Sequence, residues 1–182
     1  GGQCLDKKQN YSCNIKGQVD DYYIGDNMKL RQILINILGN AVKFTPEGGN
    51  ISLDIQRIAQ FDDRSTLQFT IKDNGIGMSE DFLPHIFDTF AQEDATAANK
   101  YGSSGLGLAI TKNIIEMMNG TIRVESKKGE GTTFIVSVTL NDSERKDTVE
   151  EELHIRPGDM AVLVIDDDPV AGEHAKLVLE QA

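Results

Sequence analysis

A strand that ends in a carboxylate constrains this chain more than any other segment. Leu67, Phe69 and Ile71 alternate with polar residues, and the same alternation puts Asp73 on their apolar face. A carboxylate on a buried face is costly unless backbone, water or a ligand donates hydrogen bonds to it. One face of the strand should therefore pack against the core, and the strand should end where hydrogen-bond donors reach the Asp73 carboxylate.

Two glycines follow this strand at once, in the segment Asp73-Asn74-Gly75-Ile76-Gly77-Met78. Gly75 and Gly77 allow positive φ angles and let another molecule approach the backbone closely. The segment is therefore either the floor of a binding pocket or a hairpin turn, because Asn-Gly is a frequent tight-turn dipeptide.

A long amphipathic helix is predicted from Asp26, a suitable N-cap, to Pro46. Its apolar residues follow helical spacing: Leu30, Ile33, Leu34, Ile37, Leu38, Ala41 and Phe44. This stripe is expected to face the core.

Asn36, Asn40 and Lys43 form a second stripe on the flank of the same helix. Asparagine lowers helix stability, so two asparagines four residues apart in one helix indicate that their amides have another role. Amide oxygens ligate hard cations and lysine meets phosphate, which suits a magnesium nucleotide. An ordinary polar flank is the alternative interpretation.

A glycine-rich segment opens the next predicted helix: Gly102-Ser103-Ser104-Gly105-Leu106-Gly107-Leu108. Small residues at a helix start leave backbone N–H groups at the positive end of the helix dipole, where phosphate binds well. A flexible loop would also explain the segment. It is neither a P-loop nor a dinucleotide-binding fingerprint, because no Gly-Lys-Ser/Thr follows and no strand leads into it.

Four segments in order resemble the N, G1, F and G2 boxes of sensor histidine kinases. They are Asn36-x-x-x-Asn40-Ala41-x-Lys43-Phe44-Thr45, Asp73-x-Gly75-x-Gly77-Met78, Ile86-Phe87-x-x-Phe90 and Gly102-x-x-Gly105-Leu106-Gly107-Leu108. Each box alone is a weak match, but the four together with this spacing are specific. The resemblance extends roughly from Asp26 to Leu140.

The resemblance implies an ATP site with Mg²⁺. In that family the residues at Asp73 and Asn40 bind the adenine amine and magnesium respectively, and the G2 segment wraps the phosphates. Asn36 and Lys43 would lie near the phosphates and act in catalysis. The implied cofactor-binding set is Asn36, Asn40, Lys43, Phe44, Asp73, Gly75, Gly77, Met78, Phe87, Phe90, Gly102, Ser103, Ser104, Gly105, Leu106, Gly107 and Leu108.

Phe87 and Phe90 resemble the F-box pair that anchors a mobile lid in the family, and core packing at helical spacing is the alternative. The lid would span Gln92 to Tyr101, which has little to bury. Ser103 stands where the family usually has a second consecutive glycine.

The predicted fold is α+β, a two-layer α/β sandwich with a mixed sheet and helices on one face. Besides the helix from Asp26, the expected elements are strand and hairpin material over 4–24, a strand over 51–58, a polar turn over 60–65, the strand ending at Asp73, a helix over 106–118 that stops at Asn119-Gly120, and a hairpin of 121–126 with 132–140.

Three parts follow one another along the sequence. The resemblance implies that residues 1–140 form the catalytic ATP-binding domain, and we expect 141–159 to be an acidic linker and 160–182 the start of a second domain. The apolar run 161–165 ends in Asp166 and Asp167 and resembles the first strand and magnesium-binding acids of a receiver domain. An acidic helix cap is the alternative.

The net charge of −11 argues against binding to nucleic acid or to an anionic membrane. No apolar run approaches the length of a transmembrane span, and no signal peptide is visible, so we expect a cytoplasmic location. The parent protein could still be anchored in the inner membrane. Cys4 and Cys13 match no metal spacing and are expected to be reduced.

His85, His154 and His174 do not fit the phosphoacceptor pattern of the family. The resemblance therefore implies the catalytic domain of a hybrid histidine kinase, which transfers the γ-phosphoryl of ATP to a histidine in a separate dimerisation domain. Partners would be that domain, in a dimeric parent, and a receiver domain. Two alternatives are a hydrolytic ATPase of the same superfamily, which would carry Glu in place of Asn36, and a nucleotide-binding module without catalysis.

Overall fold

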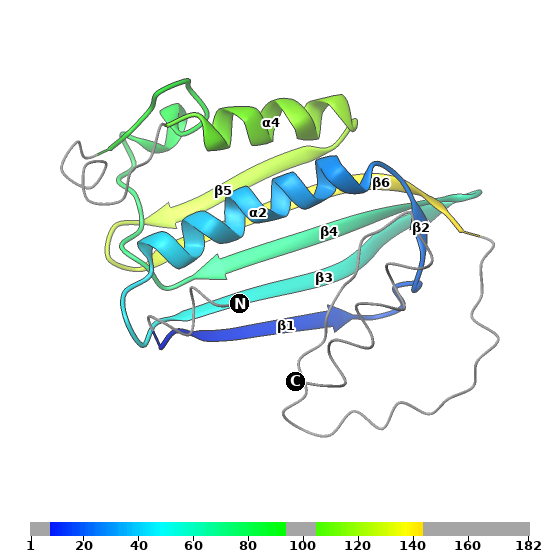
Figure 1. Cartoon of the computed structure of the whole chain (residues 1–182), viewed down its shortest axis with the longest axis horizontal. Coiled ribbons are helices and arrows are strands. Elements are labelled where there is room, and N and C mark those ends of the chain that lie inside the picture. The colour runs from blue at the N-terminus through cyan, green and yellow to red at the C-terminus, as the bar shows by residue number, and fades with distance from the viewer. Residues whose placement is uncertain (1–7, 94–104, 144–182) are drawn as a thin grey trace.

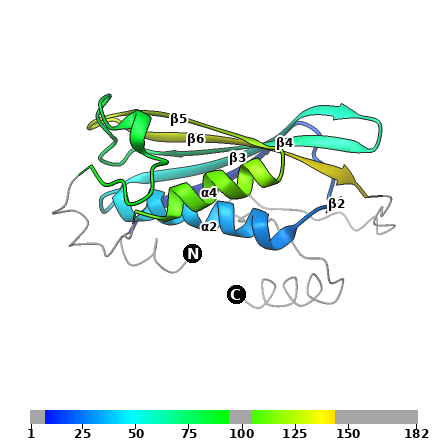
Figure 2. The same cartoon turned by 90° about the horizontal axis from the view of Figure 1, so that it is seen from above.

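A six-stranded mixed sheet carries two helices on one of its faces (Figure 1). The computed structural model describes residues 8–93 and 105–143. The elements are β1 (Asn10–Lys16), β2 (Tyr23–Ile24), α2 (Asn27–Phe44), β3 (Asn50–Phe61), β4 (Arg64–Asp73), the short 3₁₀ helix η1 (Leu83–His85), α4 (Gly107–Met117), β5 (Thr121–Lys127) and β6 (Gly131–Asp142). Viewed along the sheet, α2 and α4 form one layer and the strands the other (Figure 2). The predicted two-layer α+β fold is confirmed.

The strands are ordered β1-β3-β4-β6-β2, and β5 pairs with β6. β1 runs parallel to β3, whereas the other pairs are antiparallel. The hairpin expected near the N-terminus is wrong, because β1 pairs with β3 and β2 pairs with β6. A parallel pair needs a crossover connection, and α2 provides it between β1 and β3. Cys4 lies outside the described residues.

The core lies between the helices and the sheet. It is built from alternate residues of the three long strands and from one side of each helix. Its buried members are Leu30, Ile33, Ile37, Ala41, Ile51, Leu53, Ile55, Leu67, Phe69, Ile71, Ile86, Ile115, Phe134, Val136, Val138 and Leu140. Asp73 is buried in phase with Phe69 and Ile71, as the alternation in β4 predicts.

Helix α2 begins as predicted. The Asp26 carboxylate accepts a hydrogen bond from the Lys29 backbone N–H at 2.9 Å, and its side chain thereby caps the helix. At the other end, the Thr45 N–H donates to the Ala41 carbonyl, and Pro46 follows. The expected helix over 106–118 is α4, and it stops where Asn119 takes a φ of 52°.

The strand expected over 51–58 is longer than predicted. β3 continues to Phe61, and the turn to β4 contains only Asp62, with a φ of 52°, and Asp63. Polar residues 60 and 65 therefore belong to strands, because the sheet pairs their backbones across the hairpin.

Two isoleucines of α2 provide a matched test of this packing. Ile37 is fully buried, whereas Ile35 is 57% exposed. Replacing Ile37 with Ala should lower the free energy of unfolding by about 2–5 kcal/mol, because it leaves a cavity under the sheet. Ile35→Ala should change it by less than about 0.5 kcal/mol. Urea denaturation of both variants checks this, and equal effects would contradict the assigned helix face.

Candidate functional site

Four chain segments meet at one end of the domain, on the left in Figure 1. They are the last turn of α2, the end of β4, the turn between β5 and β6, and the first turn of α4. The N box lies in the second half of α2, the G1 box begins at the end of β4, and the described part of the G2 box leads into α4. The F box follows η1 and lies outside these four segments. Gly102, Ser103 and Ser104 of the fourth box, with most of the expected lid, lie outside the described residues.

Asp73 provides the one buried carboxylate among the described residues, with 7% of the residue exposed. One of its oxygens, Oδ1, accepts a hydrogen bond from the Gly75 N–H at 2.8 Å. Burial raises the pKa of Asp73, while the backbone N–H groups of Gly75 and Thr132 lower it in part. The carboxylate is thus satisfied by backbone, as expected, and keeps further capacity to accept hydrogen bonds.

The loop after Asp73 is held on two sides. The Ile76 N–H donates to the Phe44 carbonyl at 3.2 Å, and the Gly129 N–H donates to the Ile76 carbonyl at 2.7 Å. The loop therefore joins the end of α2 to the β5–β6 turn. The hairpin interpretation of this segment is wrong, because β4 pairs with β3 and β6 and not with the next strand of the chain.

Gly75 and Gly77 are needed here for different reasons. At Gly77, where φ is 61°, a Cβ would lie 2.0 Å from the Lys127 carbonyl oxygen. At Gly75, a Cβ would lie 2.6 Å from the Phe44 carbonyl oxygen and 2.7 Å from the Asp73 carboxylate. Any larger residue would separate the loop from α2 or from the β5–β6 turn. Met78 is half-buried, and its N–H donates to the Ser126 hydroxyl at 2.9 Å.

The two asparagines of α2 have different surroundings. The Asn36 amide donates to the Thr111 hydroxyl at 3.1 Å and to the Gly107 carbonyl at 3.4 Å, so it ties α2 to the first turns of α4. Asn40, one turn further on, is half-buried and has no hydrogen-bond partner within 8–93 and 105–143. Its amide oxygen can therefore meet a ligand without losing a bond to the described protein.

Lys43 and Phe44 close the same helix. The Lys43 ammonium lies 5.1 Å from the centroid of the Phe44 ring, within range of a cation–π interaction. Partial desolvation lowers the pKa of Lys43. With Asn40, these residues place an amide, a cation and an aromatic ring on the last two turns of α2.

The two phenylalanines of the third box differ in burial. Phe87 packs against the core, and Lys112 of α4 lies 5.5 Å from its ring. Phe90 is 71% exposed and has a φ of 63°. Its N–H donates to the Gly105 carbonyl at 3.1 Å. The core-packing interpretation therefore describes Phe87 and not Phe90, and the pair does not lie in one regular helix.

Helix α4 starts without a capping side chain, since its N-cap is Leu106 and Gly107 is its first residue. Leu108 packs against the core and fixes the first turn on the sheet. The first backbone N–H groups of α4 therefore form a potential anion site beside Asn36.

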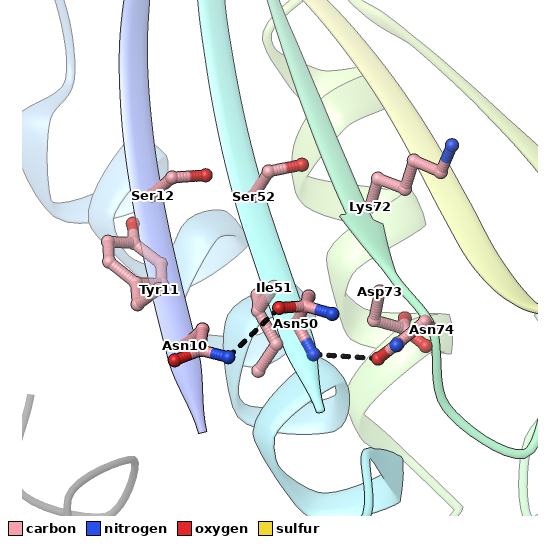
Figure 3. A pocket seen from close by; sticks show the side chains of 9 residues that line it. All are labelled: Asn10, Tyr11, Ser12, Asn50, Ile51, Ser52, Lys72, Asp73 and Asn74. Carbon is pink, nitrogen blue, oxygen red and sulfur yellow. Dashed lines mark hydrogen bonds between the residues drawn. The ribbon is translucent and has the colours of Figure 1, made fainter. Parts of the chain in front are cut away.

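A hollow of about 300 Å³ lies at the same end of the sheet (Figure 3). Its polar side chains come from alternate residues of β1, β3 and β4 that point away from the helices, namely Asn10, Ser12, Asn50, Ser52 and Lys72. Asp73 contributes to its edge but belongs to the opposite, buried face. The hollow is therefore distinct from the site between α2, α4 and β4.

Sequence reasoning placed Gly131 and Thr132 in the terminal hairpin but did not connect them with Asp73. Thr132 pairs with Asp73 across β4 and β6, and a Cβ on Gly131 would lie 2.1 Å from the Asp73 carbonyl oxygen. Only the strand pairing brings them to Asp73, so no local pattern could have found them.

The described residues contain no group of three or more His, Cys, Asp or Glu side chains that could hold a metal ion. An amide oxygen such as that of Asn40 fits a magnesium ion whose other ligands are phosphate and water oxygens. Asp166 and Asp167 lie outside the described residues. In the part of the chain that the structure describes, neither helix is long and apolar enough to cross a membrane.

Comparison with known proteins agrees with this geometry. Residues 25–142 match the family of histidine kinase-, DNA gyrase B- and HSP90-like ATPases. The chain belongs to this family. Its relatives, described next, are histidine kinases, and they identify the chain as a catalytic ATP-binding domain of the histidine kinase type.

Histidine protein kinase 1 of Candida albicans is 45% identical over 133 residues, which cover 72% of this chain and 5% of that protein. The autoinducer 2 sensor kinase/phosphatase LuxQ of Vibrio parahaemolyticus is 47% identical over 122 residues, which cover 66% of this chain and 14% of that protein. The chain thus spans a small part of the length of both. The crystal structure of full-length ShkA in complex with AMPPNP matches with a TM-score of 0.64 and 29% identity, over 78% of this chain and 28% of that chain.

The buried carboxylate predicts an unusual pH dependence of stability. Because the pKa of Asp73 is higher in the folded state, folding loses free energy as the pH rises from about 4, the ordinary pKa of Asp, through the raised value. The unfolding free energy of Asp73→Asn should therefore increase relative to that of the unmodified protein over this range. Denaturation at about pH 4 and pH 7 measures the difference.

Asp54 provides the matched control. Hydrogen bonds from Lys16 and Asn14 lower the pKa of its carboxylate, so its contribution to stability is present above the ordinary pKa and lost as the pH falls. Asp54→Asn should lose stability relative to the unmodified protein as the pH rises. The same trend in both variants would refute the assigned environment of Asp73.

Proposed function

We propose that this domain binds ATP with Mg²⁺ between α2, α4 and the end of β4, and transfers the γ-phosphoryl group to a histidine of a dimerisation domain. The observation that carries the proposal is the buried Asp73 carboxylate, satisfied by backbone donors alone, where the three elements meet. Family membership and the AMPPNP complex of ShkA support nucleotide as the ligand.

Asp73 would recognise the exocyclic amine of adenine. A buried carboxylate that keeps free lone pairs favours a ligand that donates N–H groups. Gly75, Gly77 and Met78 would line the purine, since the two glycines allow the loop after Asp73 to stay packed against α2 and the β5–β6 turn. The Phe44 ring would pack against the base, a role that its position beside Lys43 permits.

The phosphate half of the site would lie between the two helices. Asn40 would contribute an amide oxygen to Mg²⁺, which neutralises charge on the phosphates when it is bound. Lys43 would meet the phosphates as a point charge, and the first turn of α4, with Gly105 and Gly107, would donate backbone N–H groups. These groups orient the γ-phosphoryl and balance its charge, the two effects expected to dominate phosphoryl transfer.

Asn36 argues against hydrolysis. An amide cannot take a proton from water as a carboxylate does, and the Asn36 amide already donates to Thr111 and Gly107. We infer that Asn36 sets the spacing between α2 and α4 and thereby helps to position the phosphates. His85 is exposed and contacts Asp88, so it offers no acceptor near the site.

The partners of the domain follow from this reaction. The acceptor histidine would come from a dimerisation domain, and a receiver domain, of which residues 160–182 would be the start, would take the phosphoryl group next in a phosphorelay. Asp166 and Asp167 would bind Mg²⁺ in that receiver. A cytoplasmic location would suit this reaction, since it consumes ATP.

Asn40→Ala tests the magnesium assignment. Loss of the amide oxygen should bring the ratio of ATP affinities with and without Mg²⁺ to about 1, because the ion loses its protein ligand. Calorimetry with and without EDTA measures this ratio. Asn113, exposed on α4, gives the control variant Asn113→Ala, whose ratio should stay unchanged. A full magnesium response of Asn40→Ala would exclude this ligand.

Reconstitution tests the reaction itself. The domain, mixed with the separately produced histidine-bearing hairpin of its parent protein and γ-labelled ATP, should give acid-labile phosphate on the hairpin. Asp73→Ala should weaken ATP binding by roughly 1.5–3 kcal/mol, the scale of a hydrogen bond to a charged group, and reduce labelling accordingly. Rapid release of inorganic phosphate by the domain alone would instead favour a hydrolytic ATPase.

A further inference from the structure

A glutamine from the start of the sheet holds the end of α2. The last carbonyls of a helix have no partner within it. Gln9, only 8% exposed, donates from Nε2 to the Thr45 carbonyl at 2.6 Å and to the Val42 carbonyl at 3.0 Å. The Phe44 carbonyl accepts from the Ile76 N–H. The last turn of α2 is thus fixed from two sides, by β1 and by the loop after Asp73.

The orientation of the Gln9 amide is determined by its contacts. Both partners are carbonyl oxygens, which only accept hydrogen bonds, so the NH₂ group must face them. The Gln9 Oε1 atom is then buried without a partner among the described residues. An unpaired buried acceptor is unfavourable, so the fold keeps this amide at a cost to its stability.

The backbone around Gln9 is also tied to the strand next to it. The Asn10 N–H donates to the Gly49 carbonyl at 2.8 Å, and its side-chain amide donates to Asn50 at 3.1 Å. The Asn50 N–H donates to the Asn74 side chain at 2.7 Å (Figure 3). Hydrogen bonds therefore run from the start of β1 across β3 to the residue directly after Asp73.

We propose that Gln9 is a positioning residue for the phosphate half of the nucleotide site. The inference rests on the proposed function, because it assigns Asn40 and Lys43 to the magnesium and phosphates. Lys43 lies between Val42 and Phe44, and Asn40 lies on the preceding turn, so the Gln9 amide sets where both side chains point. Asp73 has its own backbone donors, and the Phe44 carbonyl is also held by the Ile76 N–H, so recognition of the purine should depend on Gln9 less than binding of the phosphates does.

Comparing ATP with adenosine, which lacks the phosphates, distinguishes a positioning role of Gln9 from simple stabilisation of the fold. Gln9→Met keeps the length of the side chain and removes both donated hydrogen bonds. The affinity for ATP with Mg²⁺ should fall about five- to twentyfold, because ligand binding must then supply the ordering of this turn that the two hydrogen bonds provided, while the affinity for adenosine should change less than about twofold. Competition against a fluorescent adenine nucleotide measures both.

Gln68→Met is the matched control. Gln68 lies on the open face of β4, and its amide makes only a long contact of 3.5 Å to Thr70, so both affinities should remain unchanged. An unchanged ATP-to-adenosine ratio in Gln9→Met, whether neither affinity falls or both fall equally, would overturn the positioning role.

Failure of the proposed function would be visible separately, because the unmodified domain would then bind neither ligand. If Gln9→Met does not fold, Gln9→Asn provides the same test. It keeps the amide but is one methylene too short to reach both carbonyls, so its ATP-to-adenosine ratio should fall as well. An unaltered ratio in this variant would equally overturn the inference.

Discussion

The burial of the Asp73 carboxylate at the end of β4 is the interaction on which the rest of the site depends. Burial raises the pKa of this carboxylate, and backbone N–H groups of Gly75 and Thr132 offset part of the cost of its charge. That arrangement requires β6 to pair with β4 in this register and the next loop to turn back under α2. The environment and the pKa of Asp73 therefore depend on both the pairing of β4 with β6 and the conformation of the loop after β4.

The sequence predicted where several residues of the proposed site lie in the fold, because the signals for their positions are local. The period of two in β4 put Asp73 on the buried face, and helical spacing put Asn40 and Lys43 on a flank of α2. What could not be predicted depends on contacts between distant segments. Thr132 reaches Asp73 only through strand pairing, and the parallel pair of β1 with β3 leaves no mark in either strand's composition. The hairpin expected near the N-terminus was wrong for this reason.

The two asparagines of α2 show why residue type alone does not define a role. Asn36 and Asn40 lie one turn apart on the same flank, yet Asn36 is bonded to α4 while Asn40 has no partner in the described chain. Because the Asn36 amide fixes α2 against α4, the Asn40 amide stays at a constant distance from the start of α4. The unbonded amide is then the one available to a ligand.

The purine and phosphate halves of the proposed site are held by different kinds of structure. Asp73 and its donors belong to the sheet and the loop that continues it, where paired strands restrict movement. Asn40, Lys43 and the first turn of α4 are placed by helix ends, which side-chain amides hold through Gln9 and Asn36. A side-chain hydrogen bond is easier to rearrange than a strand ladder, since its loss leaves the backbone pairing intact. In the proposed function, the phosphate half is therefore the part of the site whose geometry would adjust more easily than that of the purine half.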